Sequence, residues 1–160
     1  MIAIKRILAL TDCSEASSDA LLYAIKIAKN FKADLIVLKV FSTPVETIQD
    51  GMVIRDYNVD KKRPEQVQEI EAFWNRFAEN GIKPEFVNLL GDPFDEILRY
   101  SQKHSIDMIV MGTHGRTGFK HIFMGSVAEK VVRYSSIPVL TVKQKDFEYR
   151  QADNLLSSKI

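Results

Sequence analysis

Residues 107–127 read DMIVMGTHGRTGFKHIFMGSV: an apolar run, a glycine-rich stretch and the start of an amphipathic segment. The apolar run, 107–111, has the length of a strand, and the helical period that begins at Ser126 predicts a helix to Ser135. Four of the chain's seven glycines fall between positions 112 and 125. Because glycine has no Cβ, such a loop can turn its backbone amides toward an anion. The stretch therefore predicts a strand, an anion-facing loop and a helix.

The residue types of this loop leave two interpretations open. Gly125 and Ser126 begin the predicted helix, where unpaired amides and the helix dipole favour a phosphate group. Ser126 and Glu129 also match a capping box, in which the serine hydroxyl would bind the chain's own amides. Glycines after a strand can also serve only to turn the chain.

The rest of the chain repeats the alternation of strand and helix. Apolar segments predict strands at 4–10, 35–41, 85–90 and 138–142, with Lys39 the one charge inside the second. Helices are expected from about Ser14, then through Val67, Ile70, Phe73, Trp74 and Phe77 to near Gly81, and from the N-cap Asp92 and Pro93 onward. This order predicts an α/β fold with a doubly wound parallel sheet between two helical layers, in which ligands bind beyond the carboxyl ends of the strands.

Two further segments carry specific expectations. The first helix is predicted to bury a face of small residues widened by larger ones: Ala16, Ala20, Ala24, Ala28, Leu21, Ile25 and Phe31. Residues 42–63 show no clear periodicity and are longer than an ordinary connection, so we expect a functional or mobile segment there.

Composition limits the class of protein. The 160 residues suit one domain, which we place at 1–145 with a polar tail at 146–160. The formal net charge of +1 gives no overall attraction to nucleic acid or to an anionic membrane, and no apolar run reaches the length of a membrane helix. Cys13 is the single cysteine, which fits a reducing, cytoplasmic compartment. We therefore expect a cytoplasmic protein.

Asp12 and Cys13 follow the first strand, and each has two interpretations. Asp12 is either the N-cap of the first helix or a carboxylate for a nucleoside hydroxyl or a metal-linked water. Cys13 is either a small packing residue or, at the start of a helix, a thiol with a lowered pKa.

The spacing of Gly112, Gly115, Gly125 and Ser126, with two and nine residues in the gaps, resembles the ATP-binding signature of the universal stress protein family. The resemblance covers roughly 4–142, including the predicted order of strands and helices. It implies five parallel strands in the order 3-2-1-4-5, with ATP lying across the first and fourth strands. It also implies a homodimer formed through the fifth strand.

The resemblance carries over residue by residue. The residues that it implies beside the nucleoside are Leu10, Thr11, Asp12 and Val40. The residues that it implies beside the ribose are Met111 and Gly112, and those around the phosphates are Gly115, Arg116, Gly125, Ser126 and Val127. The implied function is an ATP-binding stress-response regulator or sensor that takes ATP with Mg²⁺. The alternatives are a structural dimer with an empty cleft and a slow ATP hydrolase. The chain lacks a Walker A sequence, which argues against a dedicated P-loop enzyme.

Overall fold

A computed structural model of the chain describes residues 3–42, 47–49, 52–54, 64–77, 81–113 and 124–143. Its elements, in chain order, are β1 (Arg6–Leu10), α1 (Glu15–Phe31), β2 (Asp34–Phe41), β3 (Thr47–Gln49), β4 (Met52–Ile54), α2 (Pro64–Asn75), β5 (Glu85–Leu90), α3 (Pro93–Lys103), β6 (Met108–Gly112), α4 (Ser126–Tyr134) and β7 (Val139–Val142). The predicted succession of strands and helices is confirmed. The predicted tail, 146–160, lies outside the described residues.

The main sheet has five strands in the order β5-β2-β1-β6-β7, and every neighbouring pair is parallel. Counted along the chain without the small hairpin, this is the order 3-2-1-4-5, so the expected doubly wound fold is confirmed. The order reverses between β1 and β6, where Ile7 is in register with Leu35 on one side and with Met108 on the other. Such a switch point leaves a crevice beyond the carboxyl ends of the two strands.

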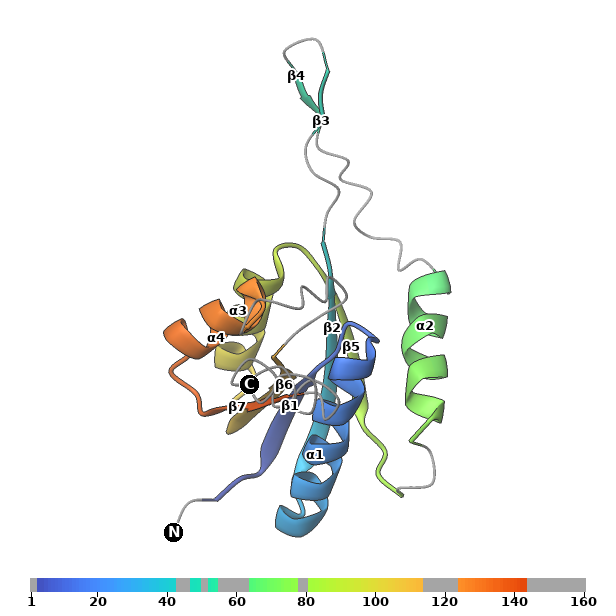
Figure 1. The fold of residues 1–160 in the computed structure, drawn as a ribbon, viewed down its shortest axis with the longest axis vertical. Coiled ribbons are helices and arrows are strands. Elements are labelled where there is room, and N and C mark those ends of the chain that lie inside the picture. Colours follow the sequence, from blue (N-terminus) through green and yellow to red (C-terminus); the bar gives the residue numbers. More distant parts are fainter. Residues whose placement is uncertain are drawn as a thin grey trace, which may run out of the picture.

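Helices cover both faces of the sheet, α1 and α2 on one and α3 and α4 on the other (Figure 1). On the α1 face, Ala20, Ala24 and Ala28 are each at most 1% exposed and pack against Ile7 and Val37. This confirms the predicted stripe of small residues for these three alanines. The central strands read as continuous apolar runs because both of their faces are buried.

Two predictions about the first face need correction. Phe31 is 52% exposed, because it is the last residue of α1 and the helix ends there in a left-handed turn at Lys32. The second helix ends at Asn75 and does not continue to near Gly81. Leu21 and Ile25 are buried as expected.

The segment 42–63, which shows no periodicity in the sequence, contains two short strands. β3 and β4 pair antiparallel, with Ile48 in register with Val53. Strands of three residues are too short to display a period of two, which is why the sequence does not reveal them.

Candidate functional site

A cavity of about 710 Å³ lies beyond the carboxyl ends of β1, β2 and β6. It is lined by Leu10, Thr11, Asp12, Ser17, Leu38, Lys39, Val40, Phe41, Ser42, Glu69, Pro93, Ile97, Met111, Gly112, Thr113, Gly125, Ser126, Val127 and Ala128. The structure thus brings together nine of the residues singled out in the sequence: Leu10, Thr11, Asp12, Val40, Met111, Gly112, Gly125, Ser126 and Val127. The other two, Gly115 and Arg116, lie outside the described residues.

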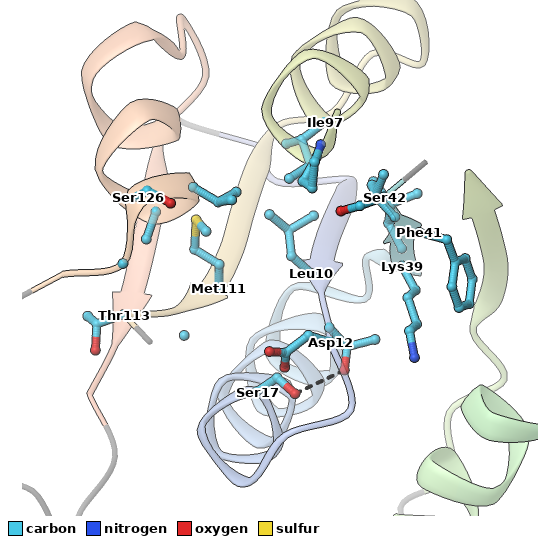
Figure 2. Close-up of a pocket in the computed structure, with 18 of the residues that line it drawn as sticks. Leu10, Asp12, Ser17, Lys39, Phe41, Ser42, Ile97, Met111, Thr113 and Ser126 are labelled. Atoms are coloured by element: carbon cyan, nitrogen blue, oxygen red, sulfur yellow. Dashed lines mark hydrogen bonds between the residues drawn. The ribbon is translucent and has the colours of Figure 1, made fainter. Parts of the chain in front are cut away.

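The cavity has an apolar wall and a polar wall. We call the apolar wall Leu10, Leu38, Val40, Pro93, Ile97, Met111 and Val127, most of which belong to the core packed under α3 and α4. The polar wall is Thr11, Asp12, Ser17, Lys39 and Glu69, on the side of α1 and α2. Figure 2 shows Leu10, Ile97 and Met111 on one side and Asp12, Ser17 and Lys39 on the other. A volume and lining of this kind suit a small ligand with one apolar and one polar part.

The N-terminus of α4 forms one end of the cavity. Its N-cap is Gly125, and no side chain of the described residues makes a capping hydrogen bond there. The alternative interpretation, a capping box with Ser126 and Glu129, is therefore wrong, because Ser126 is already the first helical residue. The backbone N–H of Gly125 donates to the carbonyl of Thr113, over 2.7 Å, and this ties α4 to the end of β6. The first amides of a helix have no partner within it, so this terminus can receive an anion.

The end of β1 is organised by short polar side chains. Asp12 accepts a hydrogen bond from the amide of Ser14 at Oδ1, over 3.0 Å, and Ser14 in turn caps α1 by accepting from the amide of Ser17. The interpretation of Asp12 as N-cap is therefore wrong, because the N-cap is Ser14, two residues later. The buried hydroxyl of Thr11 lies 3.0 Å from that of Ser17 and accepts from the amide of Cys13.

Cys13 adopts a left-handed backbone conformation, with φ of 64°, between β1 and α1. Burial raises the pKa of its thiol, and this effect outweighs the nearby Lys39 ammonium, whose Nζ lies 3.4 Å from Sγ. The suggestion of a lowered thiol pKa at this helix start is therefore wrong. The thiol is a packing group beside α1.

Lys39 and Glu69 are the charged residues of the cavity lining that the sequence analysis did not assign. The ammonium of Lys39 lies 2.6 Å from a carboxylate oxygen of Glu69, and the Lys39 side chain is only 5% exposed. The one signal in the sequence was a lysine inside an otherwise apolar strand. Its partner could not be found, since Glu69 is on α2, across the crossover that follows β2.

Two further findings concern the described part of the chain. No group of three or more histidine, cysteine, aspartate or glutamate side chains there could hold a metal ion. None of the described helices is both long and apolar enough to span a membrane.

The sequence matches the profile of the universal stress protein family over residues 3–143. The chain belongs to the universal stress protein family. Universal stress protein MJ0531 of Methanocaldococcus jannaschii is 35% identical to it over 147 residues, which cover 88% of this chain and 82% of that protein.

Solved structures agree with the fold of this universal stress protein. The structure of protein MJ0577 from M. jannaschii superposes with a TM-score of 0.67 at 28% identity, covering 90% of this chain and 99% of the other. A universal stress protein in complex with cAMP has a TM-score of 0.64 at 23% identity, covering 88% of this chain and 97% of the other. At that identity the second likeness shows the fold alone.

Proposed function

We propose that this universal stress protein binds ATP and acts as a regulator or sensor in a stress response. The observation that carries the proposal is the cavity at the switch point of the sheet. At one end it has a helix N-terminus with a glycine N-cap and no capping side chain among the described residues, and the apolar wall lies beside it. A nucleotide needs both: the free amides and helix dipole of α4 suit phosphates, and the apolar wall suits a purine. The spacing of the glycines in the sequence resembles the ATP-binding signature of the family, and this supports ATP as the ligand.

The proposed orientation follows from the two ends of the site. Gly125, Ser126 and Val127 would face the phosphates, together with Gly115 and Arg116 of the preceding loop. Met111 and Gly112 would lie along the ribose. The nucleoside would then reach Leu10, Thr11, Asp12 and Val40 at the ends of β1 and β2.

Mg²⁺ would accompany the phosphates rather than occupy a protein cage. Magnesium commonly keeps several waters and binds through phosphate oxygens and one or two carboxylates. Asp12, in the polar wall, would either bind a nucleoside hydroxyl or reach the ion through one of these waters, while Glu69, the other carboxylate of the lining, is paired with Lys39.

Binding rather than rapid catalysis is the function that this site supports. Within the described part of the site, the hydroxyls of Thr11 and Ser17 bond to each other and to backbone groups. Neither is paired with a histidine that could act as a base. We therefore infer at most slow ATP hydrolysis.

Calorimetry with purified protein tests the proposal. We expect Mg²⁺–ATP to bind more tightly than Mg²⁺–GTP, since the apolar surface around Val40 fits an adenine edge. Nucleotide released by denaturing the purified protein should include adenine nucleotide. Absence of binding at millimolar ATP would support a structural dimer with an empty cleft instead.

We further propose a cytoplasmic homodimer formed through β7. This strand is at the edge of the sheet and pairs only with β6 among the described strands. An apolar edge strand invites pairing, and two-fold pairing of one edge with itself closes the assembly.

Substitution in β7 tests this dimer. The amides of Ile109 and Thr113 donate to the carbonyls of Pro138 and Val142, so these alternate residues of β7 face β6 and Thr141 faces the free edge. Thr141→Pro removes an amide from that edge, so we expect monomers in sedimentation at micromolar concentration. Lys143 follows the strand and would be the counter-argument, as an edge-protecting charge. A monomeric parent protein, or a dimer unaffected by the proline, would refute the β7 interface.

A further inference from the structure

Helix α2 takes part in the wall of the cavity through Glu69. Among the side chains of α2 that the structure describes, Glu69 is the one that lines the cavity, while Ile70, Phe73 and Trp74 are buried toward the sheet. Phe41, at the end of β2, also lines the cavity. The polar wall therefore includes a residue from the crossover between β2 and β5, which the glycine signature does not cover.

Lys39 holds Glu69 in place. The Lys39 side chain is 5% exposed, and its ammonium contacts the Glu69 carboxylate at 2.6 Å and the Cys13 sulfur at 3.4 Å. The ammonium also lies 4.8 Å from the centre of the Phe41 ring. A buried ammonium keeps its counter-charge, because leaving it unpaired in a low dielectric is costly. The position of the Glu69 carboxylate is thus set by a fixed residue of the sheet.

The charge of this corner determines what it can bind. Lys39 offsets the negative charge of Glu69, so the corner neither attracts nor strongly repels an anion. An ionised carboxylate can only accept hydrogen bonds, and Glu69 is 38% exposed at its side chain. The group that suits this corner is a neutral hydrogen-bond donor. In Figure 2, Ser126 and Lys39 lie on opposite sides of the cavity, so a ligand with its phosphates at α4 directs its other part toward Lys39 and Glu69.

We propose that Glu69 contacts the bound nucleoside and accepts a hydrogen bond from a ribose hydroxyl or from the exocyclic amino group of the base. Lys39 is the positioning residue that orients the Glu69 carboxylate. This inference rests on the nucleotide binding proposed above and adds a contact on α2 to it.

The double variant Lys39→Met, Glu69→Leu removes the contact without leaving an unpaired buried charge. Affinities for ATP, 2′-deoxy-ATP, 3′-deoxy-ATP and purine riboside 5′-triphosphate are measured by calorimetry for the parent and the variant. A hydrogen bond to a charged group corresponds to roughly tenfold or more in affinity, so ATP should weaken by about that factor. The analogue that lacks the contacted group should bind parent and variant equally. Equal loss for all four nucleotides, or no loss for any, would overturn the contact.

An exposed ion pair at the end of the same helix offers a matched control. Arg76, the residue after α2, pairs with Glu15 of α1 at 3.0 Å, and neither residue lines the cavity. Arg76→Met should leave all four affinities unchanged. A loss equal to that of the double variant would show that any disturbance of α2 weakens binding, and would contradict a direct role for Glu69.

Hydrogen exchange on the parent protein tests the inference without a variant. Saturating Mg²⁺–ATP should slow exchange of the amides of residues 68–75 in α2, as well as of those at the start of α4. Protection at α4 with none at α2 would overturn the contact and leave the proposed function intact. Protection at neither helix would overturn the proposed nucleotide binding, and this inference with it.

Discussion

Helices α1 and α4 both begin next to the cavity, but their N-termini are built differently. At α1, Ser14 caps the helix and Asp12 binds the amide of Ser14, so side chains of the chain itself occupy this terminus. At α4, the N-cap is Gly125, and within the part of the chain that the structure describes no side chain supplies a capping bond. The comparison supports our proposal of an anion site at α4 and not at α1. A serine at the N-cap satisfies helix amides, whereas a glycine there supplies no such side chain.

Of the substitutions at the two helix starts, Gly125→Val should have the largest effect, and this effect should be on ATP affinity. The branched side chain would fill the space that we assign to a phosphate, so ATP affinity should fall by at least about a hundredfold. Gly125 has φ of −68° and ψ of 154°, an extended conformation that valine readily adopts. A positive φ is therefore not the reason for the glycine, and the fold should survive. Calorimetry and thermal unfolding measure the two effects; normal ATP affinity would place the phosphates elsewhere.

Ser14→Ala tests the start of α1, where we expect a loss of stability and little change in ATP affinity. Loss of an N-cap serine costs about 1 kcal/mol of folding stability. Urea unfolding should show this loss, while ATP affinity should change by less than about twofold because we place the phosphates of the ligand at α4. A variant that keeps its stability but loses ATP would identify the start of α1 as the anion site.

Cys13, beside the start of α1, provides the smallest expected effect. Because burial raises the pKa of its thiol, the thiol should react with iodoacetamide at pH 8 several-fold more slowly in the folded protein than in urea. A raised folded-state pKa also means that the thiol's contribution to stability is complete below the unfolded pKa and is lost as the pH rises above it. Since Cys13 is the chain's single cysteine, the labelling rate reports on it alone. A faster reaction in the folded state would contradict the buried thiol.

Much of the fold could be predicted because its elements carry local signals. The strand Glu85–Leu90 has the predicted bounds, and α3 begins as expected with Asp92 accepting from the amide of Asp95 and Pro93 in the first turn. These signals depend only on residues that are neighbours in the sequence. The predicted burial of Phe31 was wrong because periodicity alone does not show where a helix stops contacting the sheet.

The residues of the candidate site could be proposed from the sequence where a local motif or the family resemblance supplies them. The glycines and Ser126 form one motif with fixed gaps, and Asp12 and Val40 were carried over from the resemblance. The pair Lys39 and Glu69 joins residues 30 positions apart through the packing of α2 on β2, which no local pattern encodes. Ser14 rather than Asp12 as the cap of α1 likewise depends on the unusual backbone at Cys13.

The most direct test of this account is a titration of the isotopically labelled protein with Mg²⁺–ATP, followed by backbone amide chemical shifts. The amides of Ser126 and Val127 should shift strongly, because they would donate to phosphate oxygens. The amide of Ser17, which already donates to the hydroxyl of Ser14, should shift little. Unchanged shifts at α4, or large shifts confined to α1, would contradict the assignment of the phosphate site to the uncapped helix.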